Sequence, residues 1–248
     1  MLDGVARVGE WAYFAGKSLP PLLAAVPRPA LWVRPLYGVL VGALPLAGVL
    51  GVSLGPVIWM QTRGILDRTA GATELLPTVL AAAVLLELAP IGAGLIVAAR
   101  TGASLGAELS AMRVGEQVDA LELLGVSPWR RLVGPRVLAC VLATPVLHVL
   151  IAALALGSGF AAELLTGHTT WLKYRAAVTA ELRLADVVPA GLKTVAFGWL
   201  VGVTGAFTGL TARGGSEGVG RAATDSVVAC CLLVLAADVV LVGLIRAV

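Results

Sequence analysis

Residues 85–136 have the sequence LLELAPIGAGLIVAARTGASLGAELSAMRVGEQVDALELLGVSPWRRLVGPR. The stretch begins as an apolar helix, becomes polar and charged without losing helical spacing, and returns to apolar sequence after Pro128. An apolar run of about 20 residues is long enough to cross the hydrocarbon core of a membrane as a helix. We therefore interpret the stretch as one membrane helix, a short helix at the membrane surface, and the start of the next membrane helix.

The composition of the whole chain predicts a membrane protein. Of its 248 residues 58% are hydrophobic and 13% are charged, and the mean hydropathy is +0.94. Soluble domains are about 45–50% apolar and about 25% charged. The apolar runs are continuous rather than alternating, which favours helices over a barrel. The net charge is +3 and the basic residues are scattered, so nothing indicates a nucleic-acid partner. We predict an all-α polytopic membrane protein.

An amphipathic helix is predicted at residues 3–19, within an N-terminal segment of residues 1–30. At about 100° per residue its charged side chains fall within an arc of roughly 80°; they are Asp3, Arg7, Glu10 and Lys17. The apolar side chains opposite them are Val5, Val8, Ala12, Ala15 and Leu19. Phe14 does not fit this pattern. The helix is too polar to cross a membrane and is expected to lie at the interface. Pro20, Pro21, Pro27 and Pro29 are expected to break the chain before the first span.

Five membrane spans are predicted in the remaining domain, residues 31–248. They are Leu36–Met60, Leu75–Ala99, Val137–Phe160, Val187–Leu210 and Ser226–Ile245. Pro45 and Pro56 are expected to interrupt the first span. Small residues four apart predict close helix packing, at Gly38/Gly42, Gly51/Gly55 and Gly198/Gly202.

Basic residues are more numerous in the segments that lie on the side of the N terminus. The positive-inside rule then predicts a cytoplasmic N terminus and, after five spans, a periplasmic C terminus. The surface helix falls on the cytoplasmic side. Residues 161–185 fall outside and are expected to include a short helix, because Trp171 and Tyr174 suit the membrane interface.

The predicted surface helix covers Val114–Leu124. Apolar residues recur at helical spacing; they are Val114, Val118, Leu121 and Leu124. Acidic residues form a stripe beside them, at Glu116, Asp119 and Glu122. Gly125 is a good C-terminal stop. The helix either docks a cytoplasmic partner or rests on the lipid headgroups, and its acidic residues favour docking because the inner leaflet is negatively charged.

This stretch resembles the signature region of the MlaE/YrbE permeases, the membrane subunits of MCE-type lipid ABC transporters. The run KTVAFGWLVGVTGAFTGLTARGGSEGVGRAATDSVVACCLLVLAADVVL, residues 193–241, resembles the same family. The resemblance covers the chain from residue 36, so residues 31–248 would form the permease domain. One departure is Leu86, where some members have an arginine.

The resemblance implies a set of partners in the bacterial inner membrane. Two permease copies, identical or paralogous, would form the membrane core, two ATPase subunits would dock on the helix between spans two and three, and MCE-domain proteins would form a lipid conduit outside. The cargo would be phospholipid or another hydrophobic lipid. The coupling residues implied here are Arg113, Glu116, Asp119, Leu121 and Glu122.

Charged residues within or beside the predicted spans are candidate functional residues, because a charge at the bilayer centre costs about 2.5–3.5 kcal/mol. They are Glu87, Glu108, Lys193 and Asp238. At 1.5 Å per residue, Lys193 and Asp238 lie roughly 10 and 12 Å from the same membrane face. We expect them to pair near the lipid path, or to form an ion pair that only holds two spans together. Glu108 is expected to line the inner end of the cavity or to cap a helix.

Other motifs do not indicate catalysis. Gly16-Lys17-Ser18 lacks the earlier glycine of a phosphate-binding loop, so ATP and Mg²⁺ would be bound by the partner ATPase. The cysteines lie in apolar runs and read as core residues rather than metal ligands. Ser53 lies in a G-x-S-x-G match, and with His148 it allows an intramembrane serine protease as a remote alternative. His148 otherwise reads as a hydrogen-bonded core histidine. A stand-alone channel or secondary transporter is the second alternative.

Overall fold

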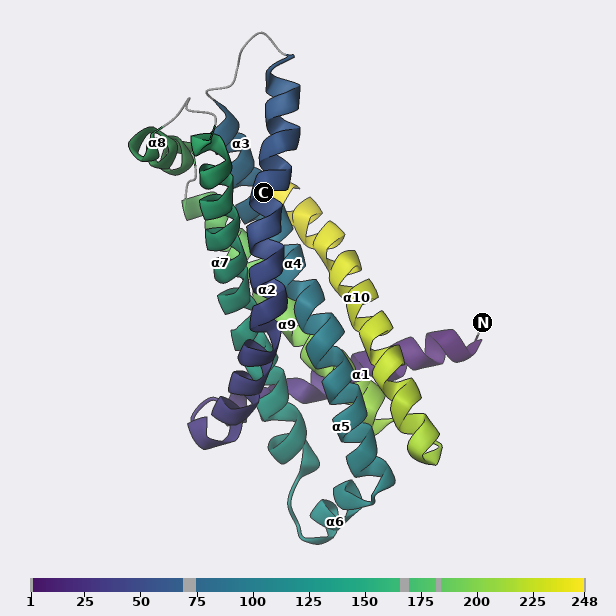
Figure 1. Ribbon diagram of the computed structural model, residues 1–248. Helices are drawn as coiled ribbons and strands as arrows, with labels where there is room; N and C mark the ends of the chain where they lie inside the picture. The colour runs from purple at the N-terminus through teal and green to yellow at the C-terminus, as the bar shows by residue number, and fades with distance from the viewer. Residues whose placement is uncertain (1, 69–74, 166–169, 182–183, 248) are drawn as a thin grey trace. The chain divides into compact units, whose positions relative to one another are not determined.

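The computed structural model describes residues 2–68, 75–165, 170–181 and 184–247 (Figure 1). Every regular element in these ranges is a helix, and three short π-helical segments (η2 to η4) interrupt the α-helices. The elements are α1 Leu2–Ala25, α2 Pro29–Leu66, α3 Leu76–Ala82, η2 Ala83–Leu88, α4 Ala89–Val97, η3 Ala98–Gly102, α5 Ala103–Val114, α6 Gln117–Leu123, η4 Trp129–Val133, α7 Gly134–Leu164, α8 Trp171–Glu181, α9 Leu184–Leu210 and α10 Gly215–Ala247.

Five helices are long and apolar enough to cross a membrane, which confirms the predicted fold class. They are Pro29–Leu66, Leu76–Val114, Trp129–Leu164, Val187–Leu210 and Gly215–Ile245. Most of these helices are longer than the predicted spans, because helical turns of more polar residues extend them beyond the apolar runs. The prediction that Pro45 and Pro56 interrupt the first span is wrong, since α2 is one continuous helix. The predicted short helix within residues 161–185 is α8.

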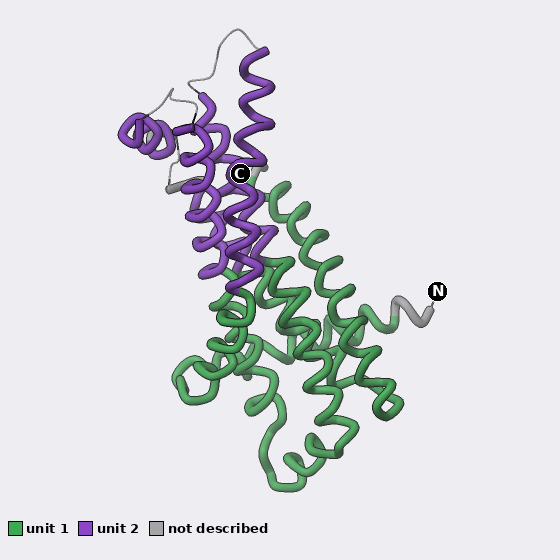
Figure 2. Tube along the Cα trace, in the orientation of Figure 1, with its two compact units in different colours: residues 1–43, 94–144, 195–248 green, residues 44–93, 145–194 purple. Residues whose placement is uncertain are grey.

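The chain divides into two compact units (Figure 2). Unit 1 contains residues 1–43, 94–144 and 195–248, and unit 2 contains residues 44–93 and 145–194. The boundary falls inside several of the membrane helices. Each unit therefore brings together segments that are far apart in the sequence.

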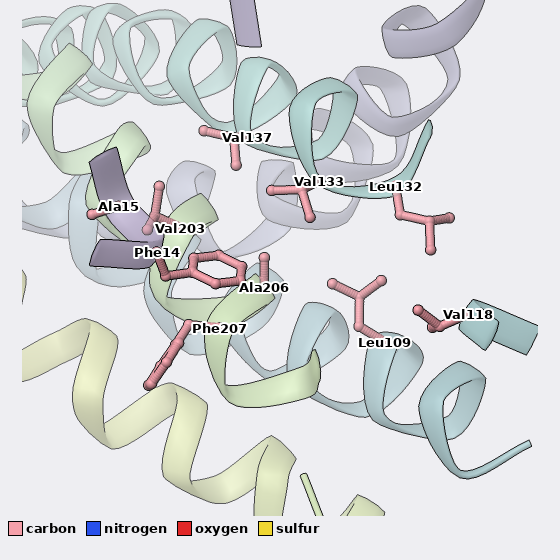
Figure 3. Close-up of a cluster of buried hydrophobic side chains, with 10 residues drawn as sticks. All are labelled: Phe14, Ala15, Leu109, Val118, Leu132, Val133, Val137, Val203, Ala206 and Phe207. Carbon is pink, nitrogen blue, oxygen red and sulfur yellow. The ribbon is translucent and has the colours of Figure 1, made fainter. Parts of the chain in front are cut away.

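Unit 1 has a buried apolar cluster that joins α1, α5, α6, η4, α7 and α9 (Figure 3). Its members are Phe14, Ala15, Leu109, Val118, Leu132, Val133, Val137, Val203, Ala206 and Phe207. The ring of Phe14 lies 4.5 Å from that of Trp129 and 5.5 Å from that of Phe207, measured between centroids. The residue that did not fit the predicted wheel is therefore the main anchor of α1.

α1 uses a different face for packing than its sequence pattern predicted. Trp11 donates a hydrogen bond to Thr204 Oγ1 at 3.1 Å, and Lys17 Nζ lies 4.9 Å from the ring centroid of Trp129. Val8 and Leu19, on the predicted apolar side, are exposed. The helix thus packs one face on the protein and leaves both charged and apolar side chains exposed on the rest of its surface.

The predicted break before the first span exists, but it lies later than Pro20 and Pro21. The helix continues through these two prolines to Ala25, and the break covers residues 26–28, so that Pro29 begins α2. Each proline removes one backbone donor, but Pro21 and Ala25 are buried against the rest of unit 1, and packing of this face offsets that loss.

Two of the three predicted glycine pairs are sites of close helix packing. A Cβ at Gly51 or Gly55 would collide with α7 in unit 2, and a Cβ at Gly198 or Gly202 would collide with α7 in unit 1. Gly38 and Gly42 differ from the prediction. A Cβ at position 38 would meet nothing within 4 Å, and one at position 42 would lie 2.5 Å from Nε of Arg100.

Candidate functional site

The predicted surface helix is α6, and both of its ends have a specific backbone structure. Val114 is the last residue of α5 rather than part of the surface helix, so the predicted start is three residues too early. Gly115 and Glu116 form the turn, and Glu116 has a left-handed φ of 56°.

The C-terminal stop predicted at Gly125 is confirmed. Gly125 has a φ of 72°, which glycine adopts without the steric cost of a Cβ. Its N–H donates to the carbonyl of Glu122 at 2.9 Å, and that of Val126 donates to the carbonyl of Leu121 at 2.9 Å. This double hydrogen bond is a Schellman motif, and it ends α6 at a defined place.

The apolar residues of α6 divide between the interior and the surface. Val118 is buried in the unit 1 cluster and Leu121 packs against it. Leu123 and Leu124 are 90% and 76% exposed. α6 lies between the second and third candidate spans. Two adjacent exposed leucines beside acidic residues make its tip a candidate contact for a partner.

The charged residues of the predicted docking site have different environments. Asp119 forms an ion pair with Arg113 on the last turn of α5, which fixes α6 against the membrane helix. Glu116 and Glu122 are exposed, and the described residues give neither of them an ion-pair partner. The side chains available to a partner are therefore Glu116, Glu122 and the exposed leucines.

The intramembrane charges of unit 2 form a direct ion pair. Lys193 Nζ donates to Glu87 Oε2 at 2.8 Å. The lysine side chain is 3% exposed and that of Glu87 is 36% exposed. Glu87 belongs to the π-helical segment η2, where the wider turn changes the direction of the side chain relative to an α-helix. π-helical turns occur frequently at functional sites.

The predicted pair of Lys193 and Asp238 stays a prediction. Asp238 is buried on α10, but it belongs to unit 1, whereas Lys193 belongs to unit 2. Glu87 was identified as an intramembrane charge without a partner. No local sequence pattern could indicate that Glu87 pairs with Lys193, because the two residues are 106 positions apart in the sequence.

Glu108 lines a cavity of about 1010 Å³ within unit 1. Its Oε1 accepts a hydrogen bond from Nη2 of Arg136 at 2.5 Å, and Arg136 also donates to the carbonyl of Leu132. Three further arginines line the same cavity; they are Arg34, Arg100 and Arg131. In the sequence, these four arginines contributed only to the prediction of which side of the membrane each segment faces. Nothing in the sequence indicated that they line one cavity.

Glu163 is a second charged residue that the sequence did not single out. It is 7% exposed, accepts a hydrogen bond from Trp59 and lies 3.6 Å from Nη1 of Arg63. All three residues belong to unit 2. An acidic residue near the end of an apolar run looks solvent-exposed in sequence, and only the tertiary contacts show that it is held by α2.

The protease alternative has no support in unit 2. Ser53 donates its hydroxyl to the carbonyl of Leu50 at 3.0 Å. His148 is buried as expected, but its Nε2 has no hydrogen-bond partner within the described residues. The predicted full hydrogen bonding of His148 is therefore not observed, and the two side chains do not form a catalytic pair.

Comparison with known proteins identifies the class. Residues 32–244 match the family described as Permease MlaE. The chain is 30% identical to a probable ABC transporter permease protein of Rickettsia typhi, over 96% of this chain and 92% of that protein. It is 29% identical to the intermembrane phospholipid transport system permease protein MlaE of Haemophilus influenzae, over 86% and 82%. It is also 35% identical to the chloroplastic protein TRIGALACTOSYLDIACYLGLYCEROL 1 of Arabidopsis thaliana, over 73% of this chain and 50% of that protein.

Proposed function

This chain belongs to the MlaE permease family of ABC transporter membrane subunits, and from that premise we propose that it moves phospholipid, or a related hydrophobic lipid, between the inner membrane and the outer envelope. Its class implies a separate ATPase partner. The chain itself is a multi-pass membrane subunit that catalyses no reaction, and ATP and Mg²⁺ bind to the partner.

The observation that carries this proposal is the exposed tip of α6. The ion pair of Arg113 and Asp119 and the buried side chain of Val118 hold the helix at the ends of two membrane helices. Leu123 and Leu124 project from that tip and are not covered by the chain. A rigid helix that presents apolar residues beside acidic ones suits the groove of a protein partner. A movement of the ATPase would reach the spans through α5 and η4, which flank α6.

The other features of the assembly follow from the same class. A second permease copy would cover part of α2 and α10, whose apolar windows are 28% and 17% buried against 56% for α7 and α9. An MCE-domain protein would take the lipid on the outer side.

The N terminus is cytoplasmic and the C terminus periplasmic. Arg113, Glu116, Asp119, Leu121 and Glu122 form or support the ATPase contact. Glu87, Glu108, Lys193 and Asp238 belong to the lipid path.

Co-purification with the ATPase subunit tests the docking proposal. Leu123→Asp places a charge where the partner's groove would contact an apolar side chain, so we expect the tagged variant to retain at most about a tenth of the ATPase that the wild type retains, which is about 1.4 kcal/mol of binding free energy. Leu165→Asp is the matched control, because Leu165 is also about 90% exposed, at 89%, but lies beyond the end of α7. Unchanged ATPase recovery with Leu123→Asp would reject α6 as the docking element.

A further inference from the structure

The cavity in unit 1 is strongly basic. Arg34, Arg100, Arg131 and Arg136 line it, and Glu108 is its one acidic lining residue. Four positive charges and one negative charge leave an excess of three. Glu108 is already paired with Arg136, and within the described ranges the other three guanidinium groups have no hydrogen bond or ion pair. Guanidinium groups that converge without a carboxylate are the arrangement that proteins use to bind phosphate.

The arginines of the cavity stand at the ends of predicted apolar spans. Arg34, Arg100 and Arg136 each stand within two residues of the end of a predicted apolar span, in α2, η3 and α7 respectively. For the second and third spans that end is the one nearer α6 in sequence, and the end of α2 at Arg34 belongs to the same unit as α6. A basic pocket between membrane helices at this depth is typical of sites for anionic lipid headgroups.

The lining also suits an amphipathic ligand. Leu31, Val39, Leu105 and Leu132 contribute apolar surface beside the arginines. A free phosphate ion would need polar groups around it on all sides, whereas a lipid requires charge for the headgroup and apolar surface for the glycerol and the first methylene groups. The volume of about 1010 Å³ is at the upper limit of ordinary ligand pockets, which are about 300–1,000 Å³.

Gly38 and Gly42 explain why the cavity is open. Gly38 lines it, and a Cβ there would meet no atom within 4 Å. Gly42 lets the guanidinium of Arg100 lie against the backbone of α2, because a Cβ would be 2.5 Å from Nε. The pair that looked like a helix-packing motif in sequence therefore leaves space for a ligand and for an arginine.

We propose that this cavity binds the phosphate headgroup of an anionic phospholipid from the membrane leaflet next to α6. The site is additional to the intramembrane charge pair, since neither Glu87 nor Lys193 lines the cavity. Arg34, Arg100 and Arg131 contact the phosphate, and the pair of Arg136 and Glu108 forms one wall. The lipid enters from the bilayer with its headgroup at the ends of α2 and α7.

Photo-cross-linking of lipid to the full chain, in complex with its ATPase, tests this site. The probe is a phosphatidylglycerol with a photoactivatable group near the headgroup, present in nanodiscs of phosphatidylcholine without ATP. We expect labelling of cavity peptides in the wild type and about a tenfold loss with Arg131→Gln, because a hydrogen bond to a charged group contributes about that factor to affinity. Arg130→Gln is the matched control, since Arg130 is the preceding residue and does not line the cavity.

Gly38→Leu supplies a second, uncharged variant. It fills the cavity without removing an arginine, and the open space at this position allows the protein to fold, which a melting curve checks. We expect the same loss of labelling. Equal labelling in Gly38→Leu and the wild type, or equal loss in Arg131→Gln and Arg130→Gln, would overturn the site. Displacement of the probe by inorganic phosphate in the buffer would overturn the lipid assignment and indicate a soluble anion. Because no arm measures transport, a negative result leaves the proposed function standing.

Discussion

At the scale of single residues, the most informative contact is the ion pair of Glu87 and Lys193. A charge inside an apolar span is costly to insert, so the presence of each residue already predicted a functional or structural role. The partner could not be predicted, because it depends on how two distant helices meet and on the π-helical turn that directs Glu87. π-helical turns have no clear signature in a single sequence.

A double-mutant cycle measures what this pair contributes to stability. Glu87→Gln and Lys193→Met each remove one partner of a charge-assisted hydrogen bond, and we expect each to lower the free energy of unfolding by about 1–3 kcal/mol. Because the residues are in contact, the double variant should be less destabilised than the sum of the single variants, by about 1 kcal/mol. Unfolding in detergent gives all three values. Strict additivity would show that the two side chains do not interact in the folded protein.

At the scale of elements, the predicted helices exist, and the errors lie at their ends and on their faces. Long apolar runs determined the five spans, and the φ of Gly125 confirmed the stop of α6. The helical-wheel pattern of α1 identified an amphipathic helix but not the face that packs on the protein. That face lies between the charged and apolar sides, so the sequence of α1 alone could not identify it.

The packing of α1 gives a prediction for this element. Phe14→Ala should lower the free energy of unfolding by about 3 kcal/mol, because it removes a buried aromatic side chain and leaves a cavity between Trp129 and Phe207. Val8→Ala is the control on the same helix, since Val8 is 67% exposed, and it should change stability by less than about 0.5 kcal/mol. Similar losses in the two variants would place α1 on the bundle in a different orientation from the one in Figure 3.

At the scale of the whole molecule, composition and family resemblance predicted the class correctly, and the structure adds how unit 1 is built. Its buried cluster connects α1 to α5, α6 and α9, so the candidate docking helix and the membrane helices share one core. The arginine cavity belongs to the same unit. The arginines that line it come from three separate segments of the chain, and their convergence becomes visible only when those segments are folded together.

We propose that this chain moves lipid only when an ATPase is docked on α6. The decisive measurement is ATP-dependent transfer of a fluorescent phospholipid from proteoliposomes that contain the purified complex. Transfer should require the ATPase subunit and ATP, should fall at least tenfold with Leu123→Asp because docking is lost, and should be unchanged with Leu165→Asp. Transfer by the chain alone, at the rate of the complex and without ATP, would contradict this dependence on the ATPase and support a channel or secondary transporter.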